Sequence, residues 1–194
     1  MRRSLAALAT ASLFTLAACG GSDDAPPADS TPAAETTTEA TTEAPAASQQ
    51  EIAVDETIKD DVMGHVIKVT GLVRDFTAPD NTNIPEGGGE WVLVEVDVTA
   101  GKKYSGGVQG GFKLTSGGQL AGTSTGIIDG AMTDAGLAPW EPASAGEHTT
   151  GWIAFQVNTR SDAYQLEYKR LAASVIGGGD PIDEKIWTID LPTA

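Results

Sequence analysis

The stretch WVLVEVDV, residues 91–98, decides the fold of this chain. Valine occupies every second position from Val92 to Val98, and the acidic residues Glu95 and Asp97 lie between the valines. Successive side chains of a β-strand point to opposite faces of a sheet. A repeat of two residues therefore predicts a strand with one face in a core and the other in water.

The same alternation of apolar and polar side chains recurs in other short segments of the chain. They are residues 65–76, 112–114, 153–157, 164–168 and 186–191. The segments between them are rich in glycine, asparagine, aspartate and proline, which favour turns. Short strands separated by such turns predict an all-β fold, an immunoglobulin-like antiparallel β-sandwich.

Helical structure is expected to be minor. The chain contains 23 glycines, and each glycine inside a helix costs about 1 kcal/mol relative to alanine. No segment has the spacing of an amphipathic helix, and only residues 131–137 and 170–176 are candidates for a helical turn.

The N-terminus resembles the signal of a bacterial lipoprotein. Arg2 and Arg3 precede an apolar run, residues 5–16, that suits a secretory signal and is too short to span a bilayer as a stable helix. The run ends in Leu-Ala-Ala-Cys at residues 16–19, which is similar to the lipobox of bacterial lipoproteins. The resemblance implies cleavage before Cys19, a diacylglycerol thioether on its sulfur, and attachment to the extracytoplasmic side of the cell membrane. The alternative is a plain secreted protein in which Cys19 is incidental.

Residues 19–50 are expected to form a disordered tether. After Cys19 this acidic stretch, rich in threonine, alanine and proline, holds no aromatic or large aliphatic residue, and it has six acidic residues without a basic one. Such a segment cannot bury enough apolar surface to offset the entropy lost on ordering. The predicted organisation is a signal peptide at residues 1–18, a linker at residues 19–50 and one β-sandwich domain at residues 51–194.

The chain is strongly acidic, with 12 lysine and arginine residues against 27 aspartate and glutamate residues and a net charge of −15. Such a charge repels nucleic-acid phosphates and anionic lipid headgroups. We therefore expect no nucleic-acid partner and a membrane contact made through the N-terminal lipid. Cys19 is the only cysteine. Once it carries lipid, no disulfide or thiol chemistry is left, and we expect no cofactor.

Four segments together resemble a bacterial domain family of unknown function, whose members are extracellular and telokin-like or immunoglobulin-like (the immunoprotective-antigen-like family). They are GGEWVLVEVDV at residues 88–98, FKL at residues 112–114 with Gly117 after it, GEHTTGWIAFQV at residues 146–157 and YQLEY at residues 164–168. Members often follow a lipobox and a linker rich in threonine, serine and proline. The resemblance implies a fold and a location but no reaction, because the family has no established catalytic residues.

Few residues are suited to catalysis or metal binding. The only two histidines, His65 and His148, lie in different segments without a nucleophile motif, and we expect them at the surface or in turns. Acidic groups at residues 55–61, 129–134 and 180–184 offer oxygen ligands but lack the spacing of a calcium-binding loop. We therefore expect neither an enzyme nor a metal site, and leave open whether these acidic groups bind calcium.

Tryptophans are the best candidates for partner contacts. Trp91 and Trp152 are out of phase with the apolar faces at Val92 and Ile153. This phase predicts that they lie on the outer surface or edge of the sheet, where a partner could contact them. The alternative is that they cover strand ends or pack under glycine-rich loops. Trp140, in the sequence APWEP, is expected in a loop and is the best single candidate.

These features favour a cell-envelope lipoprotein that presents a non-enzymatic binding domain to a protein or an envelope polymer. The alternative is an accessory protein of an envelope transport system that binds a small ligand or a metal ion. A deep pocket holding Trp140 and polar groups would favour the carrier, and a flat exposed aromatic patch would favour the interaction domain.

Overall fold

The structure is a computed structural model, and it describes residues 50–193. The predicted signal peptide, the lipidation at Cys19 and almost all of the predicted linker lie outside the described residues. The chain divides into the units Met1–Ala44 and Pro45–Ala194. The second unit contains both hydrophobic clusters of the described residues, so it has a core of its own and is expected to fold alone. Within residues 50–193, no helix has the length and apolar character needed to cross a bilayer.

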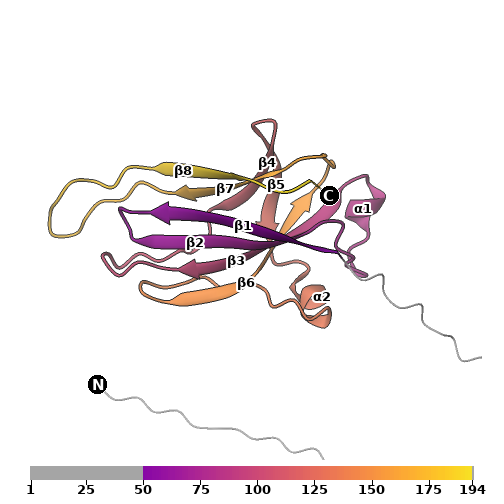
Figure 1. Cartoon of the computed structure of the whole chain (residues 1–194), viewed down its shortest axis with the longest axis horizontal. Coiled ribbons are helices and arrows are strands. Elements are labelled where there is room, and N and C mark those ends of the chain that lie inside the picture. Colours follow the sequence, from indigo (N-terminus) through magenta and orange to yellow (C-terminus); the bar gives the residue numbers. More distant parts are fainter. Residues whose placement is uncertain (1–49, 194) are drawn as a thin grey trace, which may run out of the picture. The chain divides into compact units, whose positions relative to one another are not determined.

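The described part of the chain is all-β, as the sequence predicts. Eight antiparallel strands form one sheet in the order β1-β2-β3-β6-β5-β4-β7-β8 (Figure 1). The strands are β1 (Glu51–Asp60), β2 (His65–Val73), β3 (Glu90–Thr99), β4 (Phe112–Ser116), β5 (Gln119–Thr125), β6 (His148–Val157), β7 (Gln165–Arg170) and β8 (Lys185–Asp190). Two short helices, α1 (Asn83–Glu86) and α2 (Asp129–Asp134), lie in the connections.

The sheet folds over its own apolar face, which makes the arrangement sandwich-like. β6 pairs with β3 along its full length but with β5 only over residues 154–157. The main core cluster accordingly joins Val69 of β2 to Leu114, Leu166 and Ile189 of the other half of the sheet. A buried ion pair between Asp60 of β1 and Arg170 of β7 links the same two halves.

Strand β3 has the predicted alternation, but both of its faces are covered. Its four valines, at 92, 94, 96 and 98, are fully buried in the main core. On the opposite face, Trp91 and Leu93 belong to a second cluster. That cluster also contains Phe76 and Ile84 from the β2–β3 connection, and Ile128 and Met132 from the segment of α2. The connecting segments therefore cover a face that the sequence predicts to meet water.

The expectation that Trp91 and Trp152 lie at the surface is wrong. Their exposed fractions are 1% and 6%, and both pack in the second cluster. The tip of the Trp152 ring lies over Gly71 of β2, where a Cβ atom would come within 2.8 Å of it. The alternative, that these tryptophans pack under loops, describes what the structure shows. Because the covering residues come from distant parts of the chain, the local pattern could not reveal the burial.

Two strands have no counterpart in the predictions. Only Val54, Ile58 and Asp60 of β1 are buried, so this charged edge strand shows little alternation in its sequence. β5 is likewise mostly exposed and built largely from small and hydroxyl residues. Of the two candidate helical turns, α2 overlaps residues 131–137. The segment 170–176 instead carries a β-bridge between Ala173 and Ile182 within the β7–β8 hairpin.

Candidate functional site

Trp140 is fixed on β6 by backbone hydrogen bonds. Its amide donates to the carbonyl of Trp152 over 2.9 Å, and the Trp152 amide donates to the carbonyl of Ala138 over 2.8 Å. This short parallel contact is possible because β5 pairs only with the second half of β6. Gly151 makes room for it, since a Cβ atom there would lie 2.7 Å from the Cα atom of Trp140. Trp140 thus has the loop position that the sequence predicts, but the loop is attached to the sheet.

The Trp140 ring stands at one end of an aromatic row. Its Nε1 donates to Oγ1 of Thr149 over 3.0 Å, and the ring meets Phe112 edge-on with centroids 5.6 Å apart. Phe112 contacts Tyr168 at 5.1 Å, and Tyr168 stacks on Trp187 at 5.6 Å. Burial raises the pKa of Tyr168 to about 12, so its hydroxyl stays neutral in the physiological range. The row holds Trp140 in one orientation while leaving it half-buried.

A hollow of about 310 Å3 opens beside this ring, and we call it the Trp140 hollow. Polar groups share its lining with the aromatic rings. These groups belong to Gln109, Ser124, Thr125 and Asp129. Burial raises the pKa of Asp129, and the negative charge of Glu141 adds to the effect. The hollow therefore combines an immobilised aromatic ring with hydroxyl, amide and carboxyl groups that can form hydrogen bonds.

A larger cavity of about 790 Å3 lies between the β2–β3 connection and the segment of α2, and we call it the loop cavity. Val73, Pro79, Ile127 and Leu137 contribute apolar lining. No local sequence pattern predicts this cavity, because its walls come from residues near 51, 73–81 and 127–137, which are far apart in the chain. The Ile127 side chain is 64% exposed, which places a large apolar group at the surface of this cavity.

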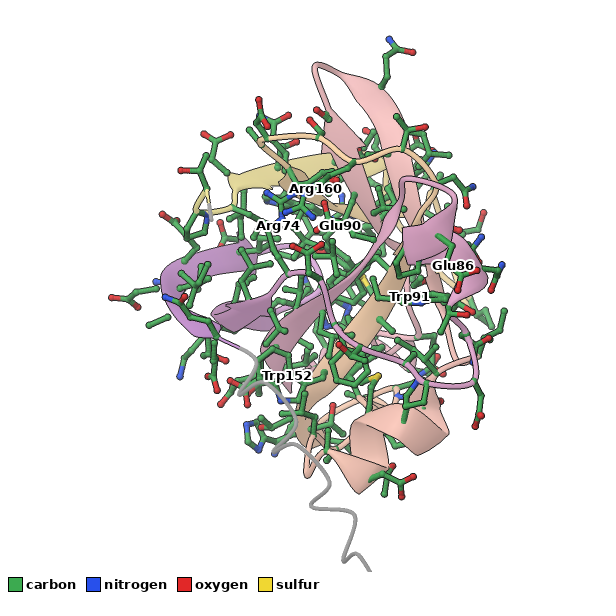
Figure 2. All side chains as sticks on the ribbon, turned by 90° about the vertical axis from the view of Figure 1, so that its right-hand side faces the viewer. Arg74, Glu86, Glu90, Trp91, Trp152 and Arg160 are labelled. Atoms are coloured by element: carbon green, nitrogen blue, oxygen red, sulfur yellow. The ribbon has the colours of Figure 1, made fainter. Side chains whose placement is uncertain are left out.

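A buried ion network lies near the start of β3. Arg74 binds Glu90 through Nε, at 3.1 Å, and through a second guanidinium nitrogen, and the Tyr164 hydroxyl donates to Glu90 over 2.7 Å. Figure 2 shows Arg74, Glu90 and Arg160 gathered together. Burial and the hydrogen bond to Glu90 raise the pKa of Tyr164 to about 12. Because each charged group already has a partner, the network fits a structural role better than a catalytic one.

The histidines occupy two different environments. His65 is 2% exposed, so the expectation of a surface or turn position is wrong for it. Its Nδ1 accepts a hydrogen bond from the Gly101 amide over 2.9 Å, and burial lowers its pKa. His148 is exposed and lies 3.1 Å from a carboxylate oxygen of Asp97. Within residues 50–193, no group of three or more histidine, aspartate or glutamate side chains is placed to hold a metal ion.

The three predicted contact residues therefore occupy different environments. Trp140 is half-buried and lines a surface hollow at which a ligand can reach it. Trp91 lies in the core, and Trp152 lines the same hollow but is only 6% exposed. Comparisons of the chain with protein-family models, with curated proteins and with solved structures found no match.

Proposed function

We propose that this chain is a lipid-anchored, non-enzymatic binding protein of the cell envelope, and that its domain binds an envelope polysaccharide at the Trp140 hollow. The observation that carries the proposal is the fixed Trp140 ring beside the polar groups of Gln109, Thr125 and Asp129. The resemblance of residues 16–19 to a lipobox and the resemblance to extracellular immunoglobulin-like domains support the proposed location. The all-β fold is compatible with that resemblance.

The chemistry of the hollow favours a sugar polymer over a folded protein. The C–H face of a pyranose ring packs on an indole ring, and its hydroxyls exchange hydrogen bonds with amide, hydroxyl and carboxyl groups. A hollow of about 310 Å3 is at the small end of ligand sites, so it is not the deep pocket around Trp140 that is expected of a carrier. Its size suits one or two units of a polymer. A pre-oriented ring also lowers the entropy lost on binding, because it is already immobilised by Thr149 and Phe112.

Trp140→Ala is expected to weaken binding to purified envelope polysaccharide by roughly thirtyfold, the effect of losing about 2 kcal/mol at an aromatic hot spot. Co-sedimentation of the unit Pro45–Ala194 with the polysaccharide measures the affinity. Trp187→Ala is the matched control, because Trp187 belongs to the same aromatic row and does not line the hollow. Equal affinity of the Trp140→Ala variant and the wild-type domain would refute the assignment of the site.

Cys19→Ser is expected to release the protein from the membrane fraction, because the thioether cannot form on serine. Fractionation of cells that express the full chain measures this, and Ser22→Ala is the control substitution beside the lipobox. Circular dichroism of the released protein should still show the β-structure of the domain, which has its own core. A variant that stays in the membrane fraction contradicts the lipid anchor.

A second function is favoured by the loop cavity. Its volume, about 790 Å3, lies within the range of small-molecule sites, which fits the alternative of a small-ligand carrier.

A further inference from the structure

The loop cavity is pre-formed by residues buried beneath it. Phe76, on the β2–β3 connection, is 1% exposed, and its amide donates to the carbonyl of Trp91 over 3.0 Å. The Nε1 of Trp91 donates to the carbonyl of Asn81 over 3.1 Å, which fixes the rim of the cavity. On the other side, Ile128 and Met132 anchor the segment of α2 in the same cluster. Core packing thus anchors both walls of the cavity.

All of the charged side chains that line this cavity are acidic. Glu51, Asp80 and Asp134 contribute to its lining, and no lysine or arginine does. Among the residues that the structure describes, none of these three carboxylates forms an ion pair. Within residues 50–193, the buried ion pairs lie elsewhere, at Arg74 and Arg170. The cavity therefore offers an apolar interior and a rim of exposed negative charge.

We infer that the loop cavity binds a small organic cation, an ammonium or guanidinium group carried on an apolar body. The apolar body would pack against Val73, Ile127 and Leu137, and the cationic group would meet the carboxylates of the rim. An organic anion is repelled by the same carboxylates. A bare metal ion is disfavoured because no described group of acidic side chains converges to coordinate it.

Three probes with the same apolar body and different head groups test the charge preference. Isothermal titration of the unit Pro45–Ala194 with octylammonium, 1-octanol and octanoate compares a cation, a neutral group and an anion. Octylammonium should bind about tenfold more tightly than octanol, the effect expected of one charge-assisted hydrogen bond, and octanoate more weakly than either. Raising the salt concentration should narrow the difference between octylammonium and octanol, because exposed charges are screened.

Matched variants locate the site. The double variant Asp80→Asn, Asp134→Asn, which leaves Glu51 as the one acidic lining residue, should remove most of the preference for octylammonium over octanol. Asp55→Asn, which changes an exposed carboxylate outside the cavity, should leave the preference unchanged. Ala135→Trp places a large side chain in the cavity from an exposed position and should remove the binding of octylammonium and octanol alike. Circular dichroism establishes that each variant is folded.

The inference rests on the second proposed function, a small-ligand carrier, and Trp140→Ala separates it from the proposed polysaccharide binding, since Trp140 does not line the loop cavity. That variant should bind octylammonium like the wild-type domain. The inference is overturned if octanol or octanoate binds as tightly as octylammonium, or if Ala135→Trp still binds it. It is also overturned if a lysine-containing apolar peptide binds at the loop cavity while free octylammonium does not, because the site then serves a polypeptide.

Discussion

Arg74→Ala is expected to lower the free energy of unfolding by about 3–5 kcal/mol, the usual cost of removing one partner of a buried ion pair. The Glu90 side chain is fully buried and that of Arg74 is 5% exposed. Without the guanidinium group, the Glu90 carboxylate keeps only the Tyr164 hydroxyl as a close partner, with Arg160 Nε 4.0 Å away. An ionised carboxylate in such a place is strongly destabilising.

The cost should lie in the upper part of this range, because Arg74 also joins two parts of the chain. Its guanidinium donates to the carbonyl of Ser161 over 2.6 Å and to that of Asp162 over 3.0 Å. These residues lie in the β6–β7 connection, whereas Arg74 directly follows β2. Loss of the side chain therefore leaves two carbonyls without a donor as well as the carboxylate.

Denaturant unfolding of the unit Pro45–Ala194 measures the change. Asp75→Asn is the control: Asp75 pairs with Arg160 at the surface, both about half exposed, so its loss should cost less than about 1 kcal/mol. Asparagine also tolerates the positive φ of 53° found at this position. Replacing both partners, Arg74→Met with Glu90→Leu, should recover part of the stability because no charge then stays buried. A cost of Arg74→Ala no larger than that of Asp75→Asn would refute the argument.

Trp91→Ala is expected to lower the free energy of unfolding by about 3–5 kcal/mol, because it empties a large volume in a packed core. Trp91 is 1% exposed and is among the largest fully buried side chains in the described part of the chain. It contacts the residues that hold the β2–β3 connection and the segment of α2 against the sheet. The cavity left behind cannot collapse easily, since the surrounding side chains come from a rigid strand and two anchored connections.

Thermal and denaturant unfolding measure the loss, and Trp91→Phe should restore more than half of it by refilling most of the volume. Trp140→Ala is the informative comparison. It should cost clearly less stability, because the ring is half-buried, while weakening ligand binding. If Trp91→Ala instead left stability unchanged and abolished binding to the polysaccharide, Trp91 would be a contact residue after all.

Much of the sheet could be predicted from local alternation. The segment at 91–98, together with the later ones that contain Phe155 and Leu166, appears as β3, β6 and β7 with the expected apolar faces in the core. β1 was missed because an edge strand in contact with water can carry charge on most positions. Of the candidate site, the loop position of Trp140 was predicted. The hollow beside it was not, because its lining comes from four separate segments.

The sequence by itself determined the class of the fold and the acidic character of the chain, because alternation and charge are properties of neighbouring residues. Only the tertiary structure decided on which strands both faces are covered. Trp91 and Trp152 became core residues because the distant segments around Phe76 and Met132 pack on them. Packing between distant segments also buries the ion pair of Arg74 and Glu90 and forms the two walls of the loop cavity. Burial depends on what packs against a residue from elsewhere in the chain, and no local pattern contains that information.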